Sequence, residues 1–382
     1  MIRYNTNGTL DTTFGVGGKV ETVVGVADAG ISAFVFQPDG KIVAVGISTN
    51  SSFGRDFAVV RYNNDGSIDN SFGVSGIAMI DFNLSYDFAF AVALQTDGKI
   101  LVSGATGDDP FYDFGMLRLD TLGVLDTTFG TGGKVVTDFG TNEDWVNAMA
   151  LQTDGKIILA GYKGYPSDIA MSRYNDDGSI DSTFGTAGKV ISSLTTEDQA
   201  NAICLQPDGK IVIGGMSAVL TNRDFSILRY NTNGLLDTTF SGNGYISTDF
   251  GTTSDKANAI ALQADGKIVA AGVAGLDFAV ARYLPSLTTG IIDFDNLSNS
   301  ILIYPNPVLD EATLNYTLSK ADIITINLVD VNGKLIKNFI TNEFREATSH
   351  NQLLSFPSNL AHGTYFIVIS NSTKQFSVQV VK

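Results

Sequence analysis

The stretch Gln37-Pro38-Asp39-Gly40-Lys41 recurs in five closely related copies and decides the fold of this 382-residue chain. The other copies begin at Gln95, Gln152, Gln206 and Gln263, and successive copies are 58, 57, 54 and 57 residues apart. Repetition at a nearly fixed period is the signature of an array of similar structural units. The architecture therefore follows from what one such unit can form.

A second motif completes each unit. It begins at Arg-Tyr or Arg-Leu and runs through Asn-x-Asn/Asp-Gly-x-x-Asp to Thr-Phe or Ser-Phe. Its copies begin at Arg3, Arg61, Arg118, Arg173 and Arg229, and a sixth Arg-Tyr stands at Arg282-Tyr283, where the array stops. The repeats thus span residues 1–283.

Each unit contains four short β-type segments separated by turn residues, and helical periodicity is absent. The first segment is small and apolar (147–151), the second is β-branched (267–271), the third alternates (57–62), and the fourth is short (133–136). Four antiparallel strands per unit, repeated radially, make a β-propeller blade, with small first strands at the crowded axis. We therefore predict an all-β fold, a β-propeller of about five four-stranded blades.

The last unit lacks a fourth segment, so closing the ring requires a strand from elsewhere. We expect residues Gly17 to Val20 to become the outer strand of the last blade, because this pairing would remove an exposed edge. Met1 opens inside a repeat unit, with no signal peptide ahead of it. Either the protein is cytoplasmic or the start of the sequence is truncated or misassigned. The tail described below favours the second interpretation, in which the blades can be a fragment of a larger ring.

The array resembles a known repeat family. The strings that carry the resemblance are Leu-Gln-x-Asp-Gly-Lys-Ile-Val and Asp-Phe-Ala-Val-x-Arg-Tyr-Asn-x-x-Gly-x-Leu-Asp-x-Thr-Phe-Gly, and they are similar to the delta-60 repeat over residues 1–283. The resemblance implies a propeller-like fold that is common in bacterial surface proteins. It implies little about a biochemical role.

The sequence after residue 283 is of a different kind. Residues 284–301 have the composition of a linker, and residues 302–382 hold several short β-type segments, as a small Ig-like β-sandwich does. Motif residues occur at Tyr304, Pro305, Asn306, Pro307, Gly333, Gly363 and Tyr365. In order and spacing they resemble the type A C-terminal sorting domain of the type IX secretion system. The resemblance implies the type IX machinery as a partner and an extracellular or outer-surface location on a Gram-negative bacterium.

Composition excludes several function classes. The net charge of −16 opposes binding to nucleic acid or to an anionic membrane, and no apolar run is long enough to span a bilayer. The lone Cys204 lies in an apolar run, which favours a buried side chain over a reactive thiol. Both histidines, His350 and His362, lie in the tail, so the array has no histidine-assisted nucleophile and no zinc site. We therefore assign no catalytic residue and no cofactor, with calcium as the one alternative.

The calcium alternative rests on oxygen-rich turns. The candidate ligands are Asn63, Asp65, Asp69, Asn175, Asp177 and Asp181, which place side-chain oxygens at alternating positions around a glycine. Calcium loops use this pattern. Asn and Asp also stabilise turns by bonding their own backbone, and this structural interpretation is the favoured one.

The loops on one face of the propeller vary, whereas the turns on the other face are nearly constant. The variable loops and their neighbours carry the candidate ligand-binding residues Phe53, Phe111, Tyr112, Trp145, Tyr162, Tyr165, Asp108, Asp109 and Asp168. Aromatic rings beside acids suit sugar stacking or protein contact. The acids that we interpret as departures from the repeat (Asp108, Asp109, Glu143, Asp144 and Asp168) are also candidates for a catalytic carboxylate pair.

These observations support one leading function and two alternatives. The leading hypothesis is a secreted or cell-surface, noncatalytic propeller that binds a polysaccharide or protein ligand through its variable-loop face. One alternative is an extracellular polysaccharide hydrolase or lyase that uses the loop carboxylates. The other is a structural component of the surface layer.

Overall fold

The computed structural model describes residues 1–49, 54–82, 86–140, 143–219, 222–251, 254–284, 297–304, 308, 310–318, 321–330, 333–346, 348–361, 363–371 and 375–382. These residues form strands and turns, with no helix among them. The chain divides into two compact units, Met1–Pro285 and Ser286–Lys382, and each is described by itself.

The first unit contains five antiparallel blades, here called blades 1 to 5; a single parallel bridge joins blades 1 and 2 into one eight-stranded sheet, and blades 3, 4 and 5 are separate sheets. Blade 1 contains β1 (Ala29–Phe36), β2 (Ile42–Thr49), β3 (Arg55–Tyr62) and β4 (Ile77–Ile80), and blade 2 contains β5 (Tyr86–Leu94), β6 (Ile100–Asp108), β7 (Phe111–Leu119) and β8 (Lys134–Thr137). Blade 3 contains β9 (Asp144–Leu151), β10 (Ile157–Lys163), β11 (Asp168–Tyr174) and β12 (Lys189–Ser192). Blade 4 contains β13 (Glu197–Leu205), β14 (Ile211–Val219), β15 (Asn222–Tyr230) and β16 (Tyr245–Thr248), and blade 5 contains β17 (Asp255–Leu262), β18 (Ile268–Ala274) and β19 (Asp277–Tyr283).

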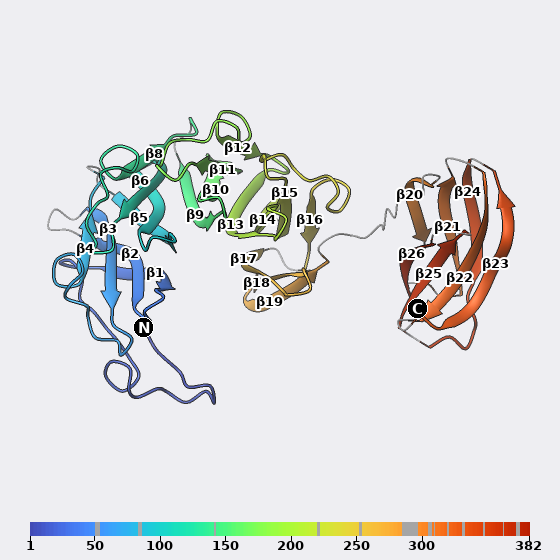
Figure 1. The fold of residues 1–382 in the computed structure, drawn as a ribbon, viewed down its shortest axis with the longest axis horizontal. Helices are drawn as coiled ribbons and strands as arrows, with labels where there is room; N and C mark the ends of the chain where they lie inside the picture. Colours follow the sequence, from blue (N-terminus) through green and yellow to red (C-terminus); the bar gives the residue numbers. More distant parts are fainter. Residues whose placement is uncertain are drawn as a thin grey trace. The chain divides into compact units, whose positions relative to one another are not determined.

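The blades follow one another around an arc (Figure 1), and the first strand of each blade lies on the inner side of that arc. Within a blade the strands pair in chain order, so each blade is an up-and-down meander. The propeller blades predicted from the repeats are confirmed.

A glycine in each second strand lets the inner strand come close. A Cβ on Gly161 would lie 1.7 Å from the carbonyl oxygen of Trp145. The register between β9 and β10 shifts at this point, as expected for a β-bulge. Glycine is therefore required at this position, and the same close approach occurs at Gly46, Gly104, Gly215 and Gly272.

A repeated clasp joins each blade to the next. In blade 3, Arg173 Nε donates to Asp181 Oδ2 (2.8 Å), and the guanidinium lies 4.5 Å from the ring centroid of Phe184. Arg173 Nη1 also donates to the carbonyl of Thr232 in blade 4, and Lys156 Nζ reaches Asp181 at 2.6 Å. The clasp recurs in the pairs Arg61–Asp69, Arg118–Asp126 and Arg229–Asp237. The arginine that opens the second repeat motif and the aspartate that follows its glycine are thus explained by contacts within and between blades.

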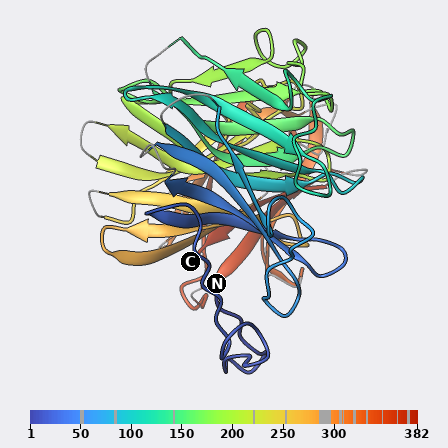
Figure 2. The same ribbon diagram turned by 90° about the vertical axis from the view of Figure 1, so that its left-hand side faces the viewer.

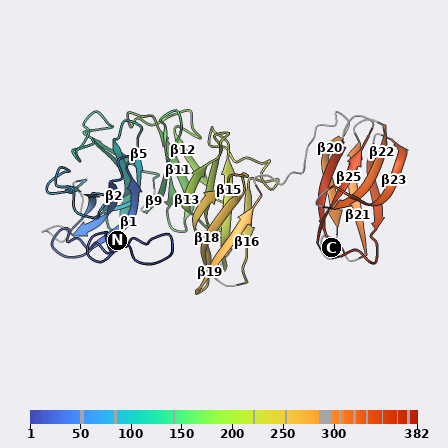
Figure 3. The same ribbon diagram turned by 60° about the horizontal axis from the view of Figure 1, so that its bottom comes forward.

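The array does not close as predicted. Met1 N donates to the carbonyl of Val20 (2.6 Å), and Ile2 bridges Lys19. Residues 17–20 therefore pair with the first residues of the chain, and within the described residues β19 pairs with β18 alone. The predicted exchange of Gly17–Val20 onto the last blade is wrong, and Figure 3 shows β1 and β2 at one end of the array and β18 and β19 at the other.

The second unit is a sandwich of two sheets around one apolar core. One sheet contains β20 (Leu297–Tyr304), β21 (Glu311–Leu318) and β24 (Ser349–Ser355). The other contains β23 (Leu335–Arg345), β22 (Asp322–Asp330), β25 (Thr364–Ser370) and β26 (Gln375–Val381). This arrangement matches the predicted β-sandwich, although β20 begins inside the segment expected to be a linker.

Candidate functional site

One face of the array gathers the loops that vary between repeats. The hairpin between the second and third strands and the link from the fourth strand to the next blade both lie at the same ends of the strands, because the strands are antiparallel. A single-residue parallel bridge joins neighbouring blades here at Arg55 and Tyr86, at Tyr112 and Glu143, and at Arg223 and Ser254. We call this end of the array the variable-loop face.

The aromatic candidates occupy different environments on this face. Phe111 and Tyr165 are exposed, Tyr112 is buried, and Trp145 and Tyr162 are half-buried. Trp145 is the second residue of β9, so it belongs to an inner strand rather than to a loop. Burial raises the pKa of Tyr162 to about 12, so its hydroxyl stays protonated at neutral pH. Phe53 lies outside the described residues.

The acidic candidates come from two blades. Asp108 and Asp109 lie in the hairpin of blade 2 that leads to Phe111, whereas Asp168 begins β11 of blade 3. Asp108 and Asp109 are exposed, and Asp168 is half-buried.

The calcium candidates make hydrogen bonds within their own turns. Asp65 Oδ1 accepts from the backbone N and the hydroxyl of Ser67, and Asp177 does the same with Ser179. Asn63 and Asn175 donate to the same two hydroxyls. Asp69 and Asp181 are the carboxylates of the clasps, each bonded to an arginine and a lysine.

An aromatic cluster that sequence reasoning missed surrounds Trp145. Tyr86, Phe88 and Phe90 follow one another on the same side of β5, with neighbouring ring centroids 6.5 and 6.2 Å apart and ring planes within 18° and 2° of parallel. The Trp145 ring lies 5.3 Å from Phe88 and 5.8 Å from Phe90, and Tyr112 lies 4.9 Å from Trp145. We call these five residues the aromatic strip.

The aromatic strip is charged at one end and open to solvent. The Arg55 guanidinium lies 5.3 Å from the Phe88 centroid, within cation–π range. Tyr86, Phe88, Phe90 and Trp145 are each partly exposed, although apolar rings of this size are usually buried. The strip therefore presents ring surface to a ligand at the start of the inner strands.

A comparison of equivalent positions shows that the strip is a departure from the repeat. The position of Phe88 is occupied by Gln199 in blade 4 and by Lys256 in blade 5. The position of Phe90 is occupied by asparagine in blades 3, 4 and 5, namely Asn147, Asn201 and Asn258. Asn147 and Asn201 bond the carbonyls of the next blade, Ala200 at 2.9 Å and Ala257 at 3.0 Å. At this position blade 2 thus has a partly exposed ring, Phe90, in place of an asparagine that bonds the next blade.

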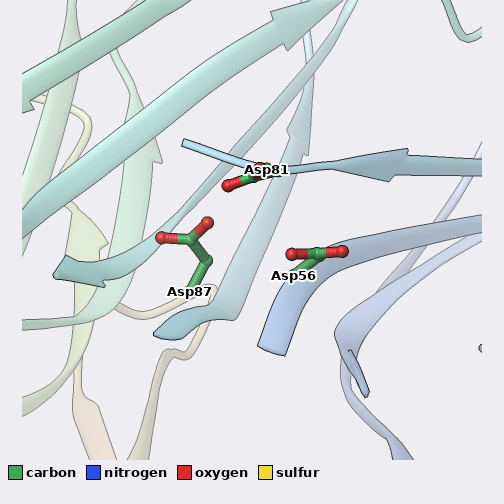
Figure 4. A group of neighbouring side chains, drawn as sticks. All are labelled: Asp56, Asp81 and Asp87. Carbon is green, nitrogen blue, oxygen red and sulfur yellow. The ribbon is translucent and has the colours of Figure 1, made fainter. Parts of the chain in front are cut away.

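Three groups of aspartates could hold a metal ion at the same face. In each group the carboxylate oxygens lie within 4.8 Å of one another. The groups are Asp56, Asp81 and Asp87 (Figure 4), then Asp113, Asp138 and Asp144, and finally Asp224, Asp249 and Asp255. Burial raises the pKa of Asp87 to about 6, and the neighbouring carboxylates of Asp81 and Asp56 add to the rise. Burial also raises the pKa of Asp113 to about 6.

The aspartate near the start of the inner strand has a structural task in blades 2, 3 and 5. Asp87 Oδ2 accepts from Phe82 N at 2.8 Å, and Asp144 and Asp255 accept likewise from Phe139 N and Phe250 N. These bonds hold the link between successive blades. Asp144 therefore recurs in the repeat, and its interpretation as a departure from the repeat is wrong.

The sorting-motif residues lie in the second unit. Gly333 closes the turn between β22 and β23, with its N donating to Asp330 O at 3.0 Å. Gly363 and Lys382 exchange backbone hydrogen bonds at the chain end, and Tyr365 donates its hydroxyl to Ala361 O. Pro305, Asn306 and Pro307 lie outside the described residues, as does the side chain of Tyr304.

Several solved structures share some likeness with this chain. A family 43 β-1,3-galactosidase aligns at 11% identity and a TM-score of 0.37, over 100% of this chain and 90% of that one. A gluconolactonase from Xanthomonas campestris aligns at 11% identity and 0.34, over 72% and 86%. A family 43 endo-arabinanase from Bacillus licheniformis aligns at 10% identity and 0.31, over 65% and 91%. All three TM-scores are below 0.5, so these likenesses carry no argument about the activity of this chain.

No curated protein matches the sequence. Across the described residues we find no helix with both the length and the apolar character of a membrane span.

Two protein families match in separate parts of the chain. The domain of unknown function DUF5122 beta-propeller matches residues 1–14, 37–72, 95–129, 152–184, 206–240 and 263–289. The secretion system C-terminal sorting domain matches residues 302–382. Both resemblances that the sequence suggested are therefore confirmed, and the sorting domain marks the protein for export to the cell surface or beyond by the type IX machinery. The first part of the chain therefore consists of DUF5122 β-propeller repeats, and residues 302–382 form a type IX secretion sorting domain.

Proposed function

We propose that this secreted propeller binds a polysaccharide through the aromatic strip on its variable-loop face, without catalysing a reaction. The observation that carries the proposal is the partly exposed row of near-parallel rings in blade 2, at positions where blades 4 and 5 have polar side chains. Sugars present apolar C–H faces that stack on such rings, while Arg55 and nearby acids offer hydrogen-bond partners. Binding of an extended protein segment is the other ligand class that this surface suits.

The chain offers its own control substitutions. Phe88→Gln and Phe90→Asn give blade 2 the residues that blade 4 has at Gln199 and Asn201. These substitutions therefore fit the blade architecture, because an equivalent inner strand already contains them. They remove the stacking surface while leaving the inner strand intact.

The single tryptophan gives a direct binding signal. Trp145 contacts Phe88, Phe90 and Tyr112, so a ligand on the strip changes its fluorescence. We expect saturable quenching of Trp145 by a bacterial or algal polysaccharide, and a loss of at least tenfold in affinity in the Phe88→Gln/Phe90→Asn variant. Leu122→Ser, on an exposed turn at the opposite end of blade 2, is the matched control and should bind normally. Equal affinity of the strip variant and the parent would refute the site.

A second candidate, polysaccharide hydrolysis, has one observation in its favour. Asp108 and Asp109 are exposed in the hairpin that leads to Tyr112 of the strip, which places two carboxylates beside a sugar bound there. Release of reducing sugar that disappears in Asp108→Asn or Asp109→Asn, with binding retained, would favour hydrolysis over binding alone.

A further inference from the structure

Arg55, the cation beside the aromatic strip, differs from the arginines of the clasps in what it contacts. Each clasp arginine bonds an aspartate, as Arg173 bonds Asp181 at 2.8 Å. Across the part of the chain that the structure describes, no carboxylate oxygen lies within 4.0 Å of the Arg55 guanidinium, which instead lies 5.3 Å from the ring centroid of Phe88. Arg55 thus has an aromatic partner and no ion pair.

Blade 4 has an arginine at the equivalent position, and there it is paired. Arg55 bridges Tyr86 at the start of the next inner strand, and Arg223 bridges Ser254 in the same way. Figure 2 shows the blue strands of blade 1 beside the teal strands of blade 2, which this bridge joins. The guanidinium of Arg223 donates to Glu197 at 3.0 and 3.3 Å. Blade 1 therefore keeps the arginine and directs it to the strip of blade 2.

A guanidinium in this environment suits an acidic group of a ligand. Its N–H donors lie in one plane and match two oxygens of a carboxylate or a sulfate. Arg55 is half-buried, and its contact with Phe88 holds it beside a ring on which a sugar would stack. Charge-assisted hydrogen bonds are roughly twice as strong as neutral ones. An acidic sugar would therefore gain more at Arg55 than a neutral sugar of the same shape.

Negative charges also lie near the strip, but they are more hydrated. Burial raises the pKa of Tyr112, the charges of Asp109 and Asp108 add to the rise, and the charge of Arg55 opposes it. Both signs of charge therefore act at Tyr112. Asp108 and Asp109 are exposed, and pairing of exposed charges contributes little, whereas Arg55 is half-buried. The arginine is thus the stronger determinant of which ligand charge is accepted.

This inference rests on the proposed binding of a polysaccharide by the aromatic strip. We propose that the polysaccharide is acidic and that Arg55 determines this specificity, by binding a carboxylate or sulfate group of a sugar that stacks on Phe88. The net charge of −16 disfavours contact between an acidic polymer and the rest of the chain. Binding is therefore confined to the place where a guanidinium and exposed rings occur together.

The test compares polysaccharides that share a backbone and differ in charge. One pair is polygalacturonate and its methyl ester, and the other is a sulfated galactan and the same galactan after desulfation. Binding to the full chain is followed by quenching of Trp145, whose ring lies 5.3 Å from Phe88. All measurements use one ionic strength and a chelator, so that divalent ions cannot bridge carboxylates.

We expect the acidic member of at least one pair to bind the parent at least about tenfold more tightly than its neutral member. The pair that shows this preference identifies the group as carboxylate or sulfate. Arg55→Gln should abolish the preference, and Arg55→Lys should restore only part of it, because an ammonium lacks the planar donors. Arg223→Gln removes the same charge from the same face at the paired arginine, so this matched control should keep the preference.

Equal affinity for both members of each pair, tighter binding of the neutral members, or a preference that survives Arg55→Gln would overturn the inference. The Phe88→Gln/Phe90→Asn variant separates this outcome from failure of the proposed function. Binding that this variant loses but that ignores the charge of the polymer removes the acidic specificity and leaves the binding site in place. If no acidic polymer quenches Trp145, the inference fails, and the proposed function fails with it only where the neutral polymers give no quenching either.

Discussion

The clasp at Arg173 gives a strong test of how the blades are held together. Replacing Arg173 with methionine keeps an apolar stem of similar length but removes the guanidinium. Asp181 then loses its 2.8 Å partner, Phe184 loses the cation above its ring, and the carbonyl of Thr232 in the next blade loses its donor. One substitution therefore breaks contacts within blade 3 and between blades 3 and 4.

The magnitude follows from burial. The side chains of Arg173 and Asp181 are 7% and 5% exposed, so Asp181 cannot recover its lost partner by hydration. Breaking a buried ion pair from one side costs about 3 to 5 kcal/mol. Lys156 remains 2.6 Å from Asp181 and retains part of the compensation, so we expect a loss of about 3 kcal/mol in the free energy of unfolding.

The array contains its own control for this experiment. Arg3 makes the same bond to Asp11 at 2.7 Å, but its side chain is 32% exposed and precedes blade 1. Arg3→Met should therefore cost far less, because exposed pairs contribute little. Urea unfolding followed by circular dichroism measures both variants. A loss under about 1 kcal/mol for Arg173→Met, or equal losses at both sites, would refute the view that burial gives the clasp its strength.

Three further predictions concern stability and export. Burial alone would raise the pKa of Asp237, but hydrogen bonds from Thr239 and Lys210 bring that pKa down to about 2. The contribution of this carboxylate to the free energy of unfolding should therefore be complete above about pH 4 and lost as the pH falls toward 2. The difference in unfolding free energy between the parent and Asp237→Asn, roughly 2 kcal/mol at pH 7, should vanish at that low pH. Gly161→Ala should destabilise by about 1 to 3 kcal/mol because its methyl group meets the backbone of Trp145, whereas Gly30→Ala, in open space, should be neutral in the same unfolding assay. Deleting residues 302–382 should abolish the appearance of the propeller outside the cell, as measured by immunoblotting of cell and medium fractions.

The sequence was sufficient to predict the blades but not to predict how the ends of the array pair. Each blade depends on local turns and on strands that are adjacent in the chain, and both repeat visibly. The predicted closing strand had to pair residues about 260 positions apart, whereas Val20 reaches Met1 within its own segment. Closing a long loop costs more entropy than closing a short one, and the local pairing forms in the structure.

The candidate site was predicted in part. Trp145 was identified because tryptophan occurs once in the chain, and it does lie in a cluster on the variable-loop face. Tyr86, Phe88 and Phe90 were missed because the inner strand was represented by the copies at 147–151 and 258–262, which are rich in small residues. Aligning residues 86–94 with 143–151 reveals the rings, but only the structure shows that they are partly exposed and contact Trp145.

Asp87 and Phe88 show how structural and functional positions separate in a repeat protein. Asp87 is buried and bonds the link from the preceding blade, and the equivalent aspartates of blades 3, 4 and 5 bond their own links. A side chain that blades 2 to 5 all use for this bond belongs to the fold, so its loss should impair stability before it impairs binding. Phe88 follows directly in the chain but has polar equivalents in blades 4 and 5. The fold tolerates those side chains, and an exposed ring at that position therefore calls for an explanation outside the packing of the blade.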